Sequence, residues 1–537
     1  MTRTFIFTAL LLALPLGAAE TTAEHFAALT TAARQANVKA EPVAPGKFQP
    51  TWESLHQYEF PEWYRDAKFG IWAHWGVQGV PEKGDWYARN MYVETERSGK
   101  PSEIWAYHRE HYGHQSVFGF KDIIPLWKAG KWDPSALVAL YKKSGAKYFM
   151  ALANHHENFD NWDSQYQPWN SVNLGPHEDL IAGWAKAAKE QGLPFGVSVH
   201  AARAWGWNGF TLASDKTGTK AGVPYDGHLT AADGKGLWWE GLDPQVDLYA
   251  QNHGPKDKPS ADYMRKFYNR TMDLINRYHP ELLYFDDDIS RGLPLYGDDP
   301  SIGLRIAAHY YNDNLAQHGG RLTGLIAAKK LSEERKQCLL YDIERGSADE
   351  ILPEPWQTDT CIGNWQYNRA RYDGHGYRKP SEIIPMLADI VSKNGNLMLN
   401  IPVREDGTID EQEVHILNEI GGWLQTNGAA IYATRPWKIF GESPPITGGT
   451  TGDRKFTAQD IRFTVSKDGR TLYAIVLGVP SQPVCIKSLA IEKISRVTLL
   501  GSDTKLDWKQ DTEALVIQPV KKWPCNYAVA FAIELLK

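Results

Sequence analysis

A short apolar run that stops abruptly in acidic residues, LLYFDDD at positions 282–288, constrains the fold of this chain more than any other segment. Apolar side chains recur at a spacing of three and four over residues 261–278, which predicts an amphipathic helix just before the run. Pro280 separates the two, and a helix followed by a buried strand is the repeating unit of a parallel α/β fold. Because polar residues at the carboxyl end of such a strand face the ligand site, we expect Asp286 to lie where chemistry is done.

The same alternation of short apolar runs and helical patterns extends over nearly 400 residues. A second helix, with an acidic start and a glycine just past its end, is predicted over residues 179–191. The pattern predicts further strands at 69–76, 147–156, 195–200, 337–344 and 396–401. Repeated strand–helix units indicate a (β/α)8-like TIM barrel, regular or irregular. A doubly wound sheet is the alternative, but no Gly-x-Gly-x-x-Gly motif follows the first strand to support it.

Changes in composition and in the hydrophobic pattern divide the chain into four parts. We expect a signal peptide at 1–19, an N-terminal lead-in at 20–50, a catalytic barrel at 51–440 and a C-terminal antiparallel β-sandwich at 441–537. The last part shows short alternating strands, with Asp468-Gly469 marking a hairpin turn. Residues 205–260, rich in Gly, Pro, Asp, Lys and Trp, predict a long loop over the barrel mouth.

The N-terminus indicates export. A basic residue, an apolar stretch and small residues precede a polar position, so a secretory signal peptide cleaved after Ala19 is expected. The apolar stretch is too short to span a membrane, and no other apolar run reaches about 18 residues. We therefore expect a periplasmic or extracellular protein that has no membrane partner.

Composition narrows the partners and the cysteine chemistry. A net charge of -6 without a basic stripe argues against nucleic acid. The 21 Trp and 25 Tyr residues suit stacking on sugars, although a large aromatic core explains them equally well. No Cys-x-x-Cys spacing occurs, so a thiolate zinc site is not expected, and oligomerisation is left open. Cys485 and Cys525 could form a disulfide in an exported chain, but free thiols are at least as well supported.

Every predicted barrel strand ends in a group able to titrate, to bond a hydroxyl or to stack on a ring. A single histidine is more often structural than functional, and Glu344 could simply form an ion pair with Arg345. Several such groups at the ends of neighbouring strands, however, favour a pocket for a hydroxylated ligand. Asp287 and Asp288 are interpreted as loop or supporting groups. Besides Asp286, the candidates are His74, Trp75, Asp85, Trp86, His155, His156, His200 and Glu344.

Several of these segments resemble the retaining α-L-fucosidases of glycoside hydrolase family 29. The resemblance runs from about residue 45 to the end of the chain. Its motifs occur in the same order as in the family, which makes the set far more specific than any one of them. They are KFGIWAHWG at 68–76, GDWYARNMY at 84–92, HHENFDNWDS at 155–164, PELLYFD at 280–286, GNLMLNIP at 395–402 and GWLQTNGAAIY at 422–432.

The resemblance implies a mechanism and a substrate. Asp286 would be the nucleophile that forms a covalent glycosyl-enzyme, while a second carboxylic acid protonates the leaving oxygen and then activates water. Glu344 fits that second role best, and Glu350 and Glu354 are rivals. The expected substrate is a terminal α-L-fucosyl residue on a fucosylated oligosaccharide or polysaccharide, with neither cofactor nor metal. The residues implied to bind fucose are His74, Asp85, Trp86, His155 and His156.

The chain departs from the family pattern in three places. Glu157-Asn158 follows the paired histidines where Asp-Gly is common, and Tyr284 replaces a common Trp before the nucleophile. His200 lies on the strand that usually carries a sugar-facing Tyr, and we expect it to take over that contact. We therefore add His200 and Tyr284 to the predicted substrate-binding residues.

Two other classes of protein remain as alternatives. A metal-dependent barrel hydrolase would use His74, His155, His156 and Asp286, but their spacing matches neither His-x-His nor His-Glu-x-x-His. A non-catalytic carbohydrate-binding protein would have the pocket without turnover, and the intact candidate carboxylates argue against it.

Overall fold

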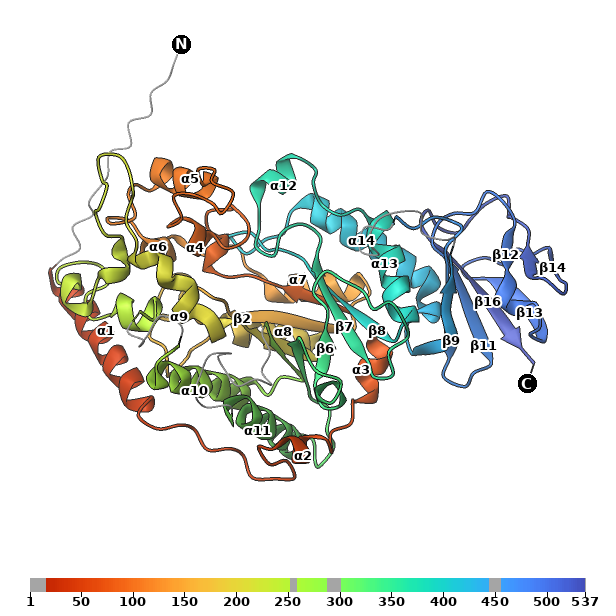
Figure 1. Ribbon diagram of the computed structural model, residues 1–537, viewed down its shortest axis with the longest axis horizontal. Helices are drawn as coiled ribbons and strands as arrows, with labels where there is room; N and C mark the ends of the chain where they lie inside the picture. Colours follow the sequence, from red (N-terminus) through yellow and green to blue (C-terminus); the bar gives the residue numbers. More distant parts are fainter. Residues whose placement is uncertain (1–15, 252–257, 287–300, 444–454, 537) are drawn as a thin grey trace, which may run out of the picture.

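A computed structural model describes residues 16–251, 258–286, 301–443 and 455–536 and contains an eight-stranded parallel barrel (Figure 1). Each strand bonds to the next along the chain, and β8 closes the barrel by pairing with β1, Gly70 opposite Met398. The predicted barrel is confirmed. Its strands are β1 (Phe69–Ala73), β2 (Tyr148–Asn154), β3 (Phe195–Val199), β4 (Leu282–Phe285), β5 (Leu325–Lys329), β6 (Leu340–Asp342), β7 (Trp356–Cys361) and β8 (Gly395–Asn400).

Helices connect and cover these strands. Short 3-10 turns and one π-helical turn fill several of the loops. The helices are α1 (Leu16–Ala36), α2 (Trp52–Leu55), α3 (Glu62–Ala67), α4 (Tyr87–Asn90), α5 (Glu103–His111), α6 (Phe120–Ile123), α7 (Pro134–Lys143), α8 (Leu180–Glu190), α9 (Ala204–Trp207), α10 (Ala261–Tyr278), α11 (Ser301–Gln317), α12 (Arg369–Asp373), α13 (Pro380–Ser392) and α14 (Glu411–Asn427).

Helix α10 has the bounds that the sequence predicts. The Ser260 side chain caps its first turn by accepting from the Tyr263 N–H at 3.1 Å, and His279 ends it in a left-handed conformation with φ 44°. Pro280 then prevents any continuation. On its buried face, Arg270 donates to the Asp160 carboxylate, with Nε 2.9 Å from Oδ2. These contacts fix the helix that leads into β4, and with it the position of Asp286.

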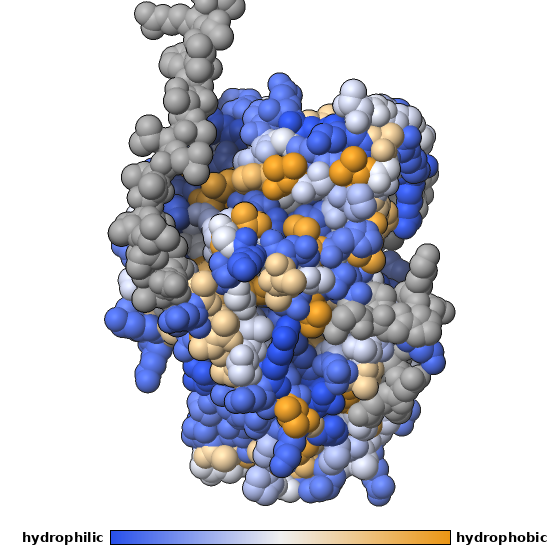
Figure 2. All heavy atoms as spheres, turned by 90° about the vertical axis from the view of Figure 1, so that its left-hand side faces the viewer, coloured by the Kyte–Doolittle hydropathy of each residue, from blue (hydrophilic) through white to orange (hydrophobic). Residues whose placement is uncertain are grey.

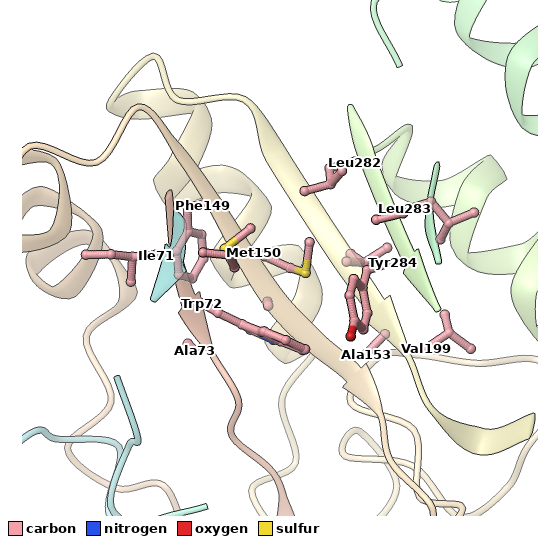
Figure 3. Close-up of a cluster of buried hydrophobic side chains, with 14 of the residues drawn as sticks. Ile71, Trp72, Ala73, Phe149, Met150, Ala153, Val199, Leu282, Leu283 and Tyr284 are labelled. Atoms are coloured by element: carbon pink, nitrogen blue, oxygen red, sulfur yellow. The ribbon is translucent and has the colours of Figure 1, made fainter. Parts of the chain in front are cut away.

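Large side chains on both faces of the barrel strands are buried (Figure 3). Ile71, Phe149 and Leu283 are fully buried, and the indole of Trp72 meets the Tyr284 ring at a centroid distance of 5.0 Å. A packed interior leaves room for a ligand only beyond the strand ends, as in other barrels of this type. Trp72 and Tyr284 therefore lie immediately beneath the candidate site.

The segment between β3 and α10 contains no strand among its described residues, in agreement with the predicted long loop. Its described part is held by the buried carboxylate of Asp226, which accepts from the hydroxyls of Tyr92 at 2.6 Å and Tyr249 at 2.5 Å. The Trp207 ring approaches that of His156, with a centroid distance of 5.7 Å. This segment therefore reaches the edge of the candidate site.

The C-terminal region consists of two antiparallel sheets at the right of Figure 1. Side chains of both sheets form one apolar cluster, so the sheets pack face to face, and β10 and β11 form the predicted hairpin at Asp468-Gly469. One sheet has the order β13-β16-β11-β10-β9 and the other β12-β15-β14. Their bounds are β9 (Thr434–Glu442), β10 (Ile461–Ser466), β11 (Thr471–Val476), β12 (Val484–Ile486), β13 (Ile494–Leu499), β14 (Trp508–Gln510), β15 (Leu515–Ile517) and β16 (Val529–Leu535).

The barrel and the sheets share buried polar contacts. Arg462 of β10 pairs with Asp389 of α13, with Nε 2.6 Å from Oδ1, and both side chains are buried. The Trp423 indole donates to the Ala528 carbonyl at 2.7 Å. The four cysteines are free thiols, so pairing of Cys485 with Cys525 is wrong: Cys485 is exposed on β12, and the Cys525 thiol lies 2.9 Å from the Ala528 carbonyl.

Figure 2 shows the face at the left of Figure 1, where hydrophobic side chains are scattered among hydrophilic ones. Over the residues that the structure describes, no helix is both long and apolar enough to cross a membrane. The predicted signal peptide lies mostly outside the described residues.

Candidate active site

A cavity of about 300 Å³ opens at the carboxyl ends of the barrel strands. Residues from β1 to β7 and the loops after them line it, so the fold brings together groups that are as much as 293 positions apart in the chain, from Trp72 to Trp365. Of the predicted residues, those on its wall are His74, Asp85, Trp86, His155, His156, His200, Asp286 and Glu344. Arg345, named beside Glu344 at the end of a predicted strand, also lines the cavity, and the lining residues that the sequence did not indicate are Trp72, Lys329, Asp359 and Trp365.

Asp286, directly after β4, is held by a cation and two imidazoles. Lys329 at the end of β5 donates from Nζ to Oδ1 at 2.5 Å. The other oxygen, Oδ2, faces His200 Nδ1 at 3.2 Å and His156 Nε2 at 3.4 Å. Burial alone would raise the pKa of Asp286, but Lys329 and the two imidazoles hold that pKa well below its usual range. The carboxylate is therefore ionised at neutral pH.

Three buried imidazoles form the wall built by β1, β2 and β3. The His155 ring lies 5.1 Å from that of His74 and 4.9 Å from that of His200, centroid to centroid. Burial lowers the pKa of all three, to about 3 for His200 and well below the usual range for His74. They are therefore neutral at pH 7, so each carries one donor and one acceptor nitrogen.

Supporting contacts orient two of the histidines on this wall. The Gln78 side-chain amide donates to His155 Nδ1 at 2.7 Å and to Glu157 Oε2 at 2.6 Å. The N–H at His156 Nδ1 donates to the His200 carbonyl at 2.6 Å. Glu157, where the family commonly has Asp, thus acts from behind the pocket wall.

Several buried polar atoms of the wall have no hydrogen-bond partner within the described protein. These atoms include both ring nitrogens of His74 and the indole N–H of Trp72. Because leaving such groups unpaired costs free energy, a ligand rich in hydroxyl groups is their natural partner.

The cavity mouth combines aromatic faces with a guanidinium. Trp86 has a left-handed backbone with φ 63°, and 49% of its surface is exposed. Asp85 accepts from the Gln366 N–H at 2.9 Å and lies 3.9 Å from Arg345. The Arg345 guanidinium in turn covers the Trp365 ring at 5.0 Å. Such surfaces suit stacking on the C–H faces of a sugar or its aglycone.

Glu344 lies beside Asp286, whereas its two rivals do not line the cavity. Lys329 Nζ donates to Glu344 Oε2 at 2.8 Å, so one ammonium group bonds both carboxylates. Glu350 is exposed in the loop that follows β6. Glu354 precedes β7 and therefore lies at the opposite, amino end of the barrel, where it pairs with Arg65 at 2.9 Å.

Two aromatic residues lie elsewhere than predicted. Trp75 belongs to the core, because its ring packs against Trp127 and Trp132 at centroid distances of 5.2 and 5.7 Å. Tyr284 is fully buried and does not line the cavity; its hydroxyl donates to Asp359 Oδ2 at 2.9 Å. Asp287 and Asp288 lie outside the described residues.

The missed residues differ in the signal that they carry in the sequence. Lys329 ends the apolar run LIAAK, which is the same signal that identified Asp286, but β5 itself was not predicted. Asp359 lies inside β7, whose sequence WQTDTC is too polar to be recognised as a buried strand. Trp365 lies in the loop after β7, and nothing in its sequence surroundings marks it.

Among the described residues, no group of three or more His, Cys, Asp or Glu side chains is arranged to hold a metal ion. Of the histidines named in the metal alternative, His155 contacts the Gln78 amide, and His156 bonds the His200 carbonyl and faces Asp286. A pocket of neutral imidazoles, aromatic faces and two carboxylates at the mouth of a (β/α) barrel defines a glycoside hydrolase.

Comparison with known proteins identifies the family. A family model described as alpha-L-fucosidase matches residues 35–429, and one for the alpha-L-fucosidase C-terminal domain matches 454–534. The tissue alpha-L-fucosidase of Rattus norvegicus is 27% identical, covering 94% of this chain and 95% of its own. The Thermotoga maritima alpha-fucosidase in complex with fucose is 25% identical, with a TM-score of 0.66, covering 90% of this chain and 100% of its own. The chain belongs to the α-L-fucosidase family, glycoside hydrolase family 29, and is an α-L-fucosidase glycoside hydrolase.

Proposed function

We propose that this α-L-fucosidase is exo-acting and retaining, with Asp286 as nucleophile and Glu344 as acid/base. The observation that carries the proposal is the shared ammonium of Lys329, which bonds one oxygen of each carboxylate at 2.5 and 2.8 Å. Those two oxygens lie no farther apart than the sum of these distances. Such proximity suits a retaining enzyme, whose carboxyl groups lie about 5–5.5 Å apart, and not an inverting one, at about 6.5–9.5 Å.

In the first step, Asp286 attacks the anomeric carbon of the fucosyl residue and forms an ester bond to it. The bond between that carbon and the glycosidic oxygen breaks, and Glu344 gives its proton to the departing oxygen. The depressed pKa of Asp286 keeps the attacking carboxylate ionised. Its contact with Lys329 keeps that carboxylate oriented in the free enzyme.

In the second step, Glu344 removes a proton from water, and the water oxygen attacks the anomeric carbon. The ester bond to Asp286 breaks, fucose leaves with its original anomeric configuration, and both carboxyl groups return to their starting states. With 43% of its side chain exposed, Glu344 is accessible to the incoming water.

Recognition of fucose is assigned to the neutral imidazole wall and the aromatic mouth. His74, His155 and His200 supply both donors and acceptors to the sugar hydroxyls. A cavity of about 300 Å³ is at the small end for ligand sites, which suits one terminal sugar and supports exo action. Trp86 and Trp365 at the mouth would contact the C–H faces of the sugar or the aglycone.

The stereochemistry of hydrolysis tests the mechanism directly. Proton NMR of 4-nitrophenyl α-L-fucoside hydrolysis should show α-L-fucose as the first product, before mutarotation gives the β anomer. First appearance of β-L-fucose would contradict the retaining mechanism. The rate should be unchanged after treatment with a strong chelator; loss of activity that zinc restores would favour the metal-dependent alternative.

The natural substrates are proposed to be fucosylated oligosaccharides or polysaccharides met outside the cytoplasm. The signal-peptide pattern at residues 1–19 supports export. N-terminal sequencing of the secreted protein should begin at Glu20, and an intact Met1 on the protein recovered from cells would contradict export through this signal. A panel of defined fucosylated glycans would then identify the preferred linkage.

A further inference from the structure

A second pair of carboxyl groups lies just beneath the reacting pair. Asp342 ends β6 and Asp359 lies in β7, and both side chains are buried. The Tyr284 hydroxyl joins them, because it lies 2.9 Å from Asp359 Oδ2 and 3.3 Å from Asp342 Oδ2. Gln357 completes the cluster by donating from Nε2 to Asp342 Oδ1 at 2.9 Å. None of the steps assigned to Asp286 and Glu344 uses this pair.

The pair faces the cation that holds the reacting carboxylates. Lys329 Nζ, which bonds Asp286 and Glu344, also lies 3.9 Å from Asp359 Oδ2. The other oxygen of Asp359, Oδ1, is buried without a hydrogen-bond partner in the described protein. Burying a carboxylate oxygen without a hydrogen bond costs free energy. We therefore interpret the position of Asp359 near the Lys329 ammonium as electrostatic.

Lys329 creates a difficulty for the acid step. An ammonium 2.8 Å from Glu344 favours the ionised form of that residue, whereas a general acid must hold its proton until the leaving oxygen takes it. A further negative charge close to Lys329 would offset this effect. Asp359 and Asp342 are the described groups placed to supply that charge.

We propose that Asp342 and Asp359 act as a positioning pair that carries one negative charge against Lys329 and so lets Glu344 keep its proton. The inference rests on the proposed acid/base role of Glu344. Burial, helped by the carboxylates of Glu344 and Asp286, raises the pKa of Asp359 to about 6. Burial, helped by the carboxylate of Asp359, raises the pKa of Asp342 well above its usual range. Two buried carboxyl groups coupled in this way favour a state in which the pair shares one proton and carries one negative charge.

Among the described residues, charged and titratable groups approach the pair from several elements, and Tyr148 of β2 is one that interacts electrostatically with Asp342. Lys329 reaches it from β5, Asp286 from the end of β4, and Glu344 from the loop after β6. Tyr284 of β4 donates to it, and Tyr64 of α3 donates to Gln357 Oε1 at 3.2 Å. Burial and the adjacent carboxylates raise the pKa of Tyr284 far above its usual value, and burial does the same for Tyr64, so both stay neutral.

The test measures the pH profile of kcat/KM with an aryl α-L-fucoside for the full chain and for D342N/D359N. Both Asn side chains keep the shape of Asp but remove the charge. Lys329 should then favour the ionised form of Glu344 without opposition, and the basic limb of the profile should move down by about one pH unit. Activity above the original limb would drop by about tenfold, which follows from a one-unit shift.

Single substitutions separate charge from structure. The D342N amide imitates the protonated form of Asp342 and leaves the charge on Asp359, so the basic limb should stay within about 0.3 pH units of wild type. Y284F removes one hydrogen bond to the ionised pair and should shift the limb in the same direction as the double variant, but less. Thermal unfolding of each variant confirms that the protein being assayed is folded.

Two outcomes would overturn the proposal. A folded D342N/D359N enzyme with an unmoved basic limb would show that the pair does not act on Glu344. Equal loss of kcat in all three variants, without any displacement of the limb, would assign the pair a structural role. A wrong assignment of Glu344 as acid/base gives a different result. In that case, Glu344→Ala in the otherwise wild-type chain would leave the basic limb of the pH profile in place.

Discussion

The two halves of the pocket respond to burial in opposite ways. On the half built by β1, β2 and β3, burial keeps His74, His155 and His200 neutral. On the half built by β4 and β5, burial would also favour the neutral form of Asp286, but Lys329 keeps that carboxylate charged. The difference is a single cation, and it separates a wall suited to binding hydroxyls from a wall suited to attack on carbon.

The largest expected effect comes from the charged half. Asp286→Asn removes the attacking carboxylate but keeps its shape, so kcat should fall by about 10⁴-fold or more. Steady-state kinetics with 4-nitrophenyl α-L-fucoside measures the loss, and Asp503→Asn, exposed in the C-terminal region away from the cavity, serves as the matched control. If D286N and D503N lost activity to the same extent, Asp286 would not be the nucleophile.

Glu344→Ala should cost less, and the cost should depend on the leaving group. With a glycan substrate, whose leaving oxygen needs a proton, kcat/KM should fall by about 10²–10⁴-fold. With 4-nitrophenol as leaving group, protonation is hardly needed, so the loss in the first step should be much smaller. Glu350→Ala provides the control, because Glu350 does not line the cavity. A uniform loss across leaving groups would argue against an acid role for Glu344.

Lys329→Met should move the pH profile without removing the nucleophile. The pKa of Asp286 is held low by Lys329, so its folded-state carboxylate stays ionised down to low pH. Without the ammonium that pKa rises, and the acidic limb of kcat/KM should move up by roughly one to three pH units. K329M should thus move the acidic limb to higher pH, whereas D342N/D359N should move the basic limb to lower pH. An unchanged acidic limb in K329M would show that Lys329 does not hold the pKa of Asp286 low.

On the neutral half, the expected effect is smaller and falls mainly on binding. His74→Phe keeps an aromatic ring but deletes two buried nitrogens that have no partner within the described protein. Loss of one or two hydrogen bonds to the sugar should raise KM by about tenfold, with a smaller change in kcat. A large fall in kcat with unchanged KM would instead place His74 among the groups that act only in the transition state.

The smallest kinetic effect is expected far from the pocket. Arg462→Met leaves Asp389 buried without its main partner, which should reduce the free energy of unfolding by about 3–5 kcal/mol. The kcat and KM of the folded enzyme should stay within about twofold of wild type. Thermal unfolding and kinetics at 25 °C separate the two quantities, and a changed KM would connect the C-terminal sheets to the site.

The sequence predicts the barrel well where periodicity and end signals agree. Residues 261–278 match α10 at both ends because the amphipathic stripe and the following Pro280 indicate the same bounds at which the structure places the Ser260 cap and the left-handed His279. The predicted strand at 337–344 is longer than β6, which spans Leu340–Asp342, because the apolar run continues beyond the paired residues. Strands β5 and β7 are missed, since one is short and alanine-rich and the other is polar.

The unpredicted strands explain what could not be foreseen at the site. Without β7, nothing in the sequence shows that Glu354 precedes a strand and so lies at the amino end of the barrel. Without β5, Lys329 has no position relative to Asp286. The pairing of Asp359 with Tyr284 depends on the register between distant strands, which no local pattern encodes.

Trapping of the covalent intermediate identifies the residue that acts as nucleophile, which we propose to be Asp286. The enzyme is incubated with 2-deoxy-2-fluoro-α-L-fucosyl fluoride, digested, and analysed by tandem mass spectrometry. The account predicts one peptide heavier by a 2-fluorofucosyl group, with the modification on Asp286 and no labelling of D286N. Labelling of another carboxylate, or full inactivation of D286N by the same reagent, would contradict it.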